Sequence, residues 1–452
     1  MIVNFIKKII VSFGIDKAIG YSVLTRVIQA LGGLISLFFI ALTLDINEQG
    51  FYYTFGSIIG IQLFFELGVT SIIVQFVAHE TAHLKWDSKT KLIGKIQHLS
   101  RLSSVLQLCV RYFTILAFFL FVALQISGYI FFKTFNSQES SVSWEYPWFI
   151  LVLSTSLLFI INPIIAFIEG LGKVKEVAIL RFYQQLIYLP SLILVLILGG
   201  KLWALGVASL LSFVFLFFSI LFSKYRILLL NIYNSINKWR INYMEEIFPY
   251  QWKIALSWIS GYLIFQLFNP ILFATEGSEI AGQMGMTLIA LNGISSISLS
   301  WINTKVPLFS RLIAKNNFKE LDSIFSKTIK ELSIINLILI LSFISFILLS
   351  AHFKLSITDR FLDISLIIIL AIASFFNQFV FAWAAYLRSH KKEPFLINSI
   401  VLGILISISV FISANYYGVA AVVISYSAIT LFVAVPWAYY IFQNKKREWH
   451  DQ

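Results

Sequence analysis

Charged side chains are scarce in this sequence: they make up 12% of its 452 residues, whereas 59% of the residues are hydrophobic. Soluble domains have about 25% charged and about 45–50% apolar residues, so this composition excludes a soluble globular protein. Apolar stretches of roughly 20 residues need lipid around them. The predicted fold class is therefore an all-α integral membrane protein.

Other absences narrow the function. The single cysteine, Cys109, excludes disulfides and metal–thiolate sites. No glycine-rich phosphate-binding loop with a lysine is present, which argues against an ATPase. His79 and His83 are four residues apart but have no third ligand, so we predict no metal and no bound cofactor. The basic segment Met1–Ala18 has no small-residue cleavage site after it, and we expect it to lie on the cytoplasmic membrane surface.

Apolar segments long enough to cross a bilayer predict about twelve transmembrane helices. They cover residues 20–44, 51–78, 105–132, 147–168, 177–198, 202–222, 250–275, 280–304, 331–350, 362–387, 395–413 and 418–442.

Lysine and arginine occur mainly in alternate loops, on what the positive-inside rule defines as the cytoplasmic side: about 27 of the 34 lie there. This predicts that both termini are cytoplasmic, and it accounts for the net charge of +12 without a nucleic-acid partner. The longest inner loop, 223–249, divides the spans into six plus six. We predict an N-terminal lobe over 1–222, a cytoplasmic linker over 223–249 and a C-terminal lobe over 250–452. The outer loops are too short to hold an extracytoplasmic catalytic domain.

Four ionisable residues stand out within the predicted spans, where a charge is costly and therefore points to function. Arg26, Arg111 and Lys253 are placed in the cytoplasmic half of the membrane, and Glu66 matches Arg26 in depth. The three cations predict a cavity that attracts an anionic headgroup. Alternatively, Arg111 and Lys253 reach the interface with their long side chains, and Arg26 pairs with Glu66 to hold two helices together.

Glu66 has two interpretations of its own. It is either a structural counter-ion or a proton or sodium site that couples transport to an ion gradient, since a carboxylate in a low-dielectric site can titrate near neutral pH.

Uncharged polar side chains within the spans favour hydrogen bonds between helices, although some could face a hydrated cavity and bind sugar hydroxyls. The Gly56-x-x-x-Gly60 pair is typical of ordinary close helix packing. The polar residues are Gln29, Gln62, Gln75, Asn162, Gln266, Asn269, Asn292, Asn303, Asn377 and Gln378.

Several stretches resemble polysaccharide-repeat flippases of the O-antigen type, a branch of the multidrug/oligosaccharidyl-lipid/polysaccharide superfamily. They are LDINEQGFYYTFGS at 44–57, FFELGV at 64–69, QFVA at 75–78, and EGLG at 169–172 leading to Arg181. The resemblance implies two six-helix lobes around a central cavity in a bacterial cytoplasmic (inner) membrane. It also implies an undecaprenyl-diphosphate-linked oligosaccharide as cargo, a polysaccharide polymerase and chain-length proteins as partners, and cavity cations that match Arg26 and Arg111.

Three hypotheses follow. The first is a flippase that works by alternating access, with the diphosphate on Arg26 and Arg111. The second is a multidrug or cation antiporter of the same superfamily, against which the intramembrane balance of three cations to one anion argues. The third is a membrane polymerase or glycosyltransferase, which ranks last because the outer acidic residues are scattered through short turns. We therefore predict a transporter and not an enzyme.

Overall fold

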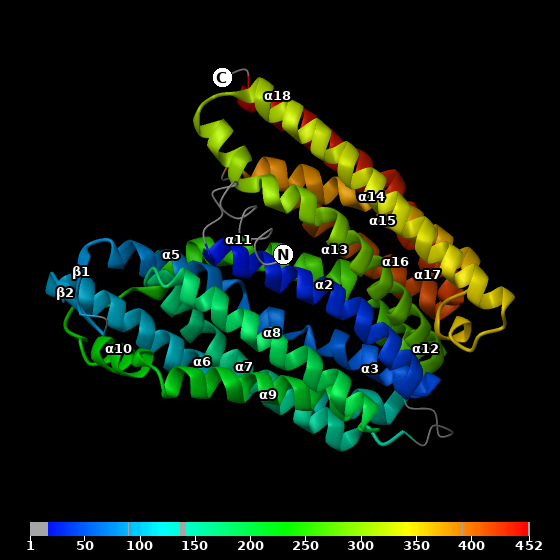
Figure 1. Ribbon diagram of the computed structural model, residues 1–452, viewed down its shortest axis with the longest axis horizontal. Helices are drawn as coiled ribbons and strands as arrows, with labels where there is room; N and C mark the ends of the chain where they lie inside the picture. The colour runs from blue at the N-terminus through cyan, green and yellow to red at the C-terminus, as the bar shows by residue number, and fades with distance from the viewer. Residues whose placement is uncertain (1–16, 89, 136–141, 391, 451–452) are drawn as a thin grey trace, which may run out of the picture. The chain divides into compact units, whose positions relative to one another are not determined.

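The computed structural model describes residues 17–88, 90–135, 142–390 and 392–450 (Figure 1). Helices make up nearly all of this part of the chain, and eleven of them are long and apolar enough to cross a membrane. The first predicted span falls in a further helix, α2, of which the apolar part Gly32–Thr43 is described fully enough to be assessed. The predicted all-α membrane fold is confirmed, and every predicted span coincides with a helix or a run of helices.

The spans follow one another along the chain, and three of them are interrupted: the second comprises α3–α5, the seventh α11–α12, and the twelfth α17–α18. Their bounds are α2 Lys17–Thr43, α3 Ile46–Ile59, α4 Gln62–Glu66, α5 Val69–Thr81, α6 Ile96–Phe135, α7 Glu145–Gly170, α8 Val174–Ile197, α9 Trp203–Leu221, α11 Phe248–Phe265, α12 Phe268–Glu276, α13 Ser278–Ala314, α14 Phe318–His352, α15 Ile364–Arg388, α16 Leu396–Tyr416, α17 Gly418–Ile429 and α18 Val435–His450.

Several helices extend well past the apolar segment that predicted them. Helix α6 has 40 residues, or about 60 Å at about 1.5 Å per residue, which is twice the thickness of a bilayer core. Helices α13 and α14 have 37 and 35 residues. The extensions lie at the basic ends, where polar residues continue the helix beyond the apolar segment. Hydropathy therefore predicts the apolar segment of each of these helices but not the polar extension.

Two compact units divide the described residues, but not at the predicted boundaries. The first unit holds residues 17–32 together with Ile61–Thr134 and Ser143–Ala255. The second unit holds Gly33–Gly60 and the chain from Leu256 onward. The second half of α2 and all of α3 therefore group with the C-terminal helices.

Close backbone packing explains why α3 belongs to the second unit. A Cβ atom added to Gly50 would lie 1.9 Å from the carbonyl oxygen of Ser278, and one added to Gly282 would lie 2.9 Å from the amide nitrogen of Gly50. Only residues without side chains permit this approach of α3 to α13. Gly56 has nothing within 4 Å of such an added atom, so the Gly56-x-x-x-Gly60 pair is not the packing motif of this helix.

The predicted linker is packed against the first unit. It contains the short helix α10 (Lys224–Tyr233) and a π-helical turn at Tyr243–Ile247. Ser103 Oγ on α6 donates a hydrogen bond to the carbonyl of Tyr233 at 2.8 Å, and Ser100 Oγ donates to that of Trp239 at 2.6 Å. The segment thus has a fixed place on α6.

A two-stranded antiparallel hairpin interrupts the helical pattern in the polar segment between α5 and α6. Its strands are β1 (Leu84–Ser88) and β2 (Lys91–Gly94). Lys173 Nζ, just before α8, lies 4.2 Å from the ring centroid of Trp86, a distance that permits a cation–π contact. Hydropathy gives no indication of this hairpin because both strands are short and largely exposed.

Candidate functional site

The second span breaks in the middle, at the point where its carboxylate lies. Leu67 and Gly68 both have left-handed backbone conformations, with φ of 48° and 69°, so α4 ends at Glu66 and α5 begins at Val69. An L-residue such as Leu67 rarely adopts this conformation, which marks a strained position. The Thr70 hydroxyl donates a hydrogen bond to the Glu66 carboxylate across the break. Broken membrane helices are a common place for ion and substrate sites.

Arg181, on α8, interacts electrostatically with the carboxylate beside this break. Its Nη1 donates hydrogen bonds to Asn162 Oδ1 on α7 at 2.9 Å and to Gln184 Oε1 at 3.0 Å. The carboxylates of Glu169 and Glu66 both interact electrostatically with its guanidinium. The arginine is thereby fixed among polar groups from three spans.

These residues form one partly buried group, which we call the Arg181 cluster. It combines one guanidinium with two carboxylates, and therefore carries one excess negative charge when all three groups are ionised. A proton or a small cation could balance that charge, which makes the cluster a candidate ion site. Its members are Glu66, Thr70, Asn162, Glu169, Arg181 and Gln184.

Close packing of α5 against α7 holds part of the cluster in place. A Cβ atom added to Gly170 would lie 2.8 Å from the carbonyl oxygen of Val74 and 2.6 Å from Val77 Cβ. The glycine lets the two helices approach, and it directly follows Glu169. In the EGLG stretch at 169–172, Gly170 thus packs α7 against α5, and its neighbour Glu169 contributes a charge to the Arg181 cluster.

The four predicted site residues all belong to the first unit, but the structure does not show them as one group. Glu66 is in the Arg181 cluster. Arg111 lies on α6 with an exposed side chain. The backbone of Arg26 lies in α2 and that of Lys253 in α11, while both side chains fall outside the described residues.

Arg181 is the important residue that sequence reasoning assigns to the wrong place. The charge pattern counts it among the cytoplasmic loop cations although the predicted span 177–198 includes it, and the structure shows it as the eighth residue of α8 and partly buried. The signal is available in principle: Arg181 follows an apolar run, and Gln184 and Gln185 one turn later are polar within the same span.

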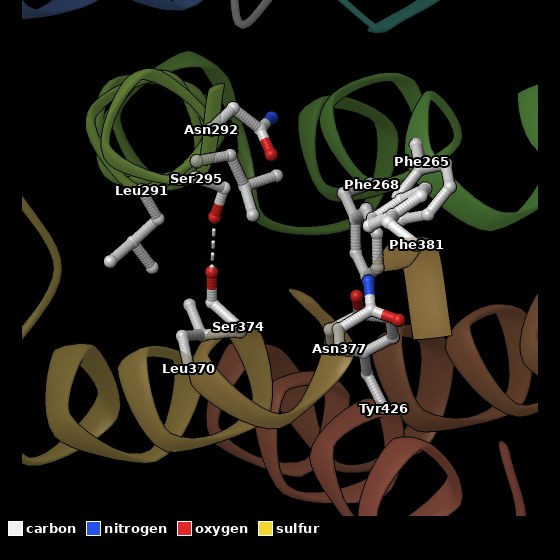
Figure 2. Close-up of a pocket in the computed structure, with 11 residues that line it drawn as sticks. Phe265, Phe268, Leu291, Asn292, Ser295, Leu370, Ser374, Asn377, Phe381 and Tyr426 are labelled. Carbon is white, nitrogen blue, oxygen red and sulfur yellow. Dashed lines mark hydrogen bonds between the residues drawn. The ribbon is translucent and has the colours of Figure 1, made fainter. Parts of the chain in front are cut away.

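A cavity of about 170 Å³ lies within the second unit (Figure 2). Aromatic rings form two of its lining pairs: Phe265 with Phe381, centroids 6.1 Å apart, and Phe268 with Tyr426, centroids 5.0 Å apart. Leu288, Leu291 and Leu370 complete its apolar lining. No charged residue lines this cavity in the described part of the chain.

Polar groups from two helices also face this cavity. Figure 2 shows Asn292 and Ser295 on α13 and Ser374 and Asn377 on α15. The two serine hydroxyls are 3.0 Å apart and hydrogen-bonded to each other. Asn292 and Asn377 are among the predicted intramembrane polar residues, and the structure places both at a cavity.

A third polar group ties together the basic end of the first unit. The buried Glu80 carboxylate accepts hydrogen bonds from Arg101 Nε and His98 Nδ1, each at 2.7 Å. Arg101 also binds Glu246, at 2.5 Å from Nη2 to Oε2. The Arg101 guanidinium holds the pKa of the Glu246 carboxyl below its ordinary value. The described residues contain no group of three or more metal-binding side chains, and we assign this network a structural role.

Comparisons with known proteins define the fold and no more. No protein-family model and no curated protein matches the sequence. Among solved structures, an inward-facing multidrug resistance MATE family transporter of the MOP superfamily aligns with a TM-score of 0.60 and 14% identity, over 92% of this chain and 99% of that one. The MATE multidrug transporter DinF-BH in complex with rhodamine 6G also gives a TM-score of 0.60, at 13% identity over 96% and 95%.

A MOP superfamily transporter from Pyrococcus furiosus aligns with a TM-score of 0.52 and 14% identity, over 94% of both chains. Its structure is described as having a binding pocket of reverse polarity that suggests a different function. The fold of this chain is therefore the two-lobed fold of the MATE transporters. The predicted two-lobed fold is confirmed, while the superfamily and its polysaccharide branch stay predictions.

Proposed function

We propose that this protein is a secondary transporter that carries an amphipathic molecule across the membrane by alternating access. The single observation that carries the proposal is full-length agreement with the MATE fold, over 92% of this chain and 99% of the first neighbour. That neighbour is described as inward-facing, and another similar structure, with a TM-score of 0.53, as an outward-facing conformation of such a transporter. The neighbours are transporters, which supports transport as the role of this chain too.

The Arg181 cluster supports ion coupling as the driving force. Glu66 ends a broken helix, accepts a hydrogen bond from Thr70 and shares the Arg181 guanidinium with Glu169. Protonation of a carboxylate, or binding of Na⁺ to it, would release Arg181 from one of its two acidic partners. Such an exchange would change the electrostatic interactions among α4, α7 and α8, which is what a coupling site has to do.

The comparisons favour an organic compound, as carried by multidrug transporters, as the cargo. The neighbours with TM-scores of 0.60 are both described as multidrug transporters, one of them in complex with rhodamine 6G. The expected argument against this class is a balance of three cations to one anion in the membrane. The Arg181 cluster adds one cation, Arg181, and one anion, Glu169, so cations still outnumber anions and this charge balance weighs against the comparisons.

A lipid-linked oligosaccharide is the second candidate cargo. The exposed Arg111 on an apolar span supports it, because a guanidinium suits a diphosphate, and the uncharged amide-lined cavity suits a sugar. In that case the protein would serve polysaccharide assembly in a bacterial inner membrane, beside a polymerase and chain-length proteins.

Two cellular readouts separate the cargoes. Expression in a bacterial strain that lacks its own multidrug pumps tests the first: growth should continue at several-fold higher rhodamine 6G concentrations than in the vector control. Deletion of the gene in its own host tests the second, which predicts loss of surface polysaccharide and accumulation of the lipid-linked precursor. A strain with neither phenotype, at normal protein levels, contradicts the proposed transport role.

A further inference from the structure

We infer that the cavity of the second unit is a binding site for one neutral six-membered ring with hydrogen-bonding groups at its edge. The inference rests on the proposed transport role, because the ring would be part of the cargo, either a sugar residue or an aromatic ring. It adds what neither the fold nor the comparisons give: the place in this chain where such a ring binds, and its charge.

The size of the cavity fits a single ring. A cavity of about 150 Å³ in another protein is large enough to hold benzene, and this one measures about 170 Å³. A fused dye or a whole disaccharide would need more space than that. The occupant is therefore one ring of a larger molecule, or a small molecule alone.

The aromatic side chains that line the cavity favour a ligand that contains a ring. Phe268 and Tyr426 are 2% and 8% exposed and meet edge to face, so their positions are fixed by packing. Phe381, which is 40% exposed, pairs with Phe265 at the cavity. Aromatic faces attract the C–H edges of another aromatic ring and equally the C–H face of a pyranose.

The polar rim selects hydrogen-bonding groups at the edge of the ring. Within the described residues, the amides of Asn292 and Asn377 make no hydrogen bond to another side chain or to the backbone. Each amide offers a donor and an acceptor, so together they can bind a hydroxyl group in either role. The Ser295–Ser374 pair adds two hydroxyls nearby. Asn377 and the aromatic rings line the same cavity (Figure 2), so one ligand can contact both.

The absence of charge on the described lining sets the charge of the ligand. A charged ring would lose its hydration here with no carboxylate or cation to replace it, and an unpaired charge in an apolar site costs far more than a neutral polar group. A neutral ring loses only hydrogen bonds to water, which the two amides can replace.

The test is ligand binding to the full-length protein in lipid nanodiscs, measured by saturation-transfer NMR. The probes are methyl β-D-glucopyranoside, benzyl alcohol, and benzylamine, which is a cation at neutral pH. We expect at least one neutral probe to bind, and benzylamine to bind at least tenfold more weakly than benzyl alcohol or the glucoside. Binding of the glucoside alone identifies a sugar as the source of the ring, and binding of benzyl alcohol alone identifies an aromatic group.

Matched variants locate the binding. Asn377→Leu and Asn292→Leu should weaken the neutral probe roughly three- to tenfold, the effect of one lost hydrogen bond. Phe381→Ala should weaken it about tenfold. The controls are Asn303→Leu, an exposed asparagine on the same helix as Asn292, and Phe376→Ala, a phenylalanine on α15 that is 41% exposed and does not line the cavity.

Equal binding by cavity and control variants overturns the inference, as does benzylamine binding as tightly as the neutral probes. Asn292 is exposed, so its leucine variant should fold even if the buried positions tolerate change poorly. Probe binding that depends on the cavity residues, in protein that moves no cargo in liposomes, would defeat the transport role and leave the ring site standing. Transport of cargo without such probe binding would defeat the ring site and leave the transport role standing.

Discussion

Arg181 Nη1 donates a hydrogen bond to Asn162 Oδ1 at 2.9 Å, and this bond joins α8 to α7 inside two apolar spans. The same guanidinium interacts with Glu66 beside the break in the second span. One arginine therefore joins α7 and α8 by a hydrogen bond and interacts electrostatically with Glu66 of the second span.

Replacement of Arg181 should abolish transport with little loss of protein. In Arg181→Gln the carboxylates of Glu66 and Glu169 lose their shared cation, and we expect cargo flux to fall at least tenfold. Arg181→Lys should recover only part of it, because an ammonium group lacks the planar fork that binds Asn162 and Gln184. Flux into proteoliposomes measures the effect. Lys175→Gln, an exposed position on the same helix, is the control and should keep normal flux; equal flux in Arg181→Gln would contradict the role.

Gly50 should tolerate no side chain, whereas Gly56 should. A methyl group on Gly50 would lie 1.9 Å from the Ser278 carbonyl oxygen, so the backbones of α3 and α13 would have to separate. Gly56, on the same helix, has open space around it. We expect Gly50→Ala to remove most of the monodisperse protein in size-exclusion chromatography and Gly56→Ala to leave it unchanged. Equal yields for the two variants would show that the close approach of α3 to α13 is not needed for folding.

Glu246 should make stability depend on pH in the acidic range. Its folded pKa lies below the ordinary value of 4.5, chiefly through the hydrogen bond from Arg101. The stabilisation is therefore present above the unfolded pKa and is lost as the pH falls below it. Between pH 6 and pH 3.5 the melting temperature of the wild type should decrease by more than that of Glu246→Gln. Glu245→Gln, a neighbouring exposed position, should follow the wild type; parallel curves for wild type and Glu246→Gln would contradict the assignment.

The cytoplasmic position of both termini stays a prediction, and two serines test the orientation. Ser326 lies on the basic part of α14, and Ser356 lies in the loop that follows the same helix; both are exposed. The one native cysteine, Cys109, is buried. In intact cells an impermeant maleimide should label Ser356→Cys and not Ser326→Cys, which should react only after the membrane is opened. The opposite pattern would invert the predicted orientation.

Much of the fold could be predicted from the sequence, because a helix that crosses lipid needs a long apolar segment. All twelve apolar segments are helices, and the loops between them fall where charge and turn residues indicate. The grouping of α3 with the second unit could not be predicted, since it depends on backbone contact at Gly50, and hydropathy carries no information on partners. The extra length of α6 is missed because its first turns are polar.

The candidate site could be predicted only in part. Glu66 can be found because a lone acid in an apolar span stands out. Arg181 is misplaced because a cation close to the end of a span looks the same in sequence as a loop cation. The break at Leu67 and Gly68 could not be read from residue types, since leucine normally favours a continuous helix.

Counterflow in proteoliposomes tests the central claim of ion-coupled alternating access most directly. The liposomes are loaded with unlabelled cargo, either rhodamine 6G or a lipid-linked oligosaccharide. For one of these two cargoes, the liposomes should exchange the unlabelled molecule for labelled external cargo, and the exchange should be saturable. An imposed proton or sodium gradient should speed net uptake several-fold in the wild type and leave Glu66→Gln unaffected, because the glutamine amide cannot titrate. Exchange no faster than in protein-free liposomes for both cargoes, or a gradient response that persists in Glu66→Gln, would contradict the account.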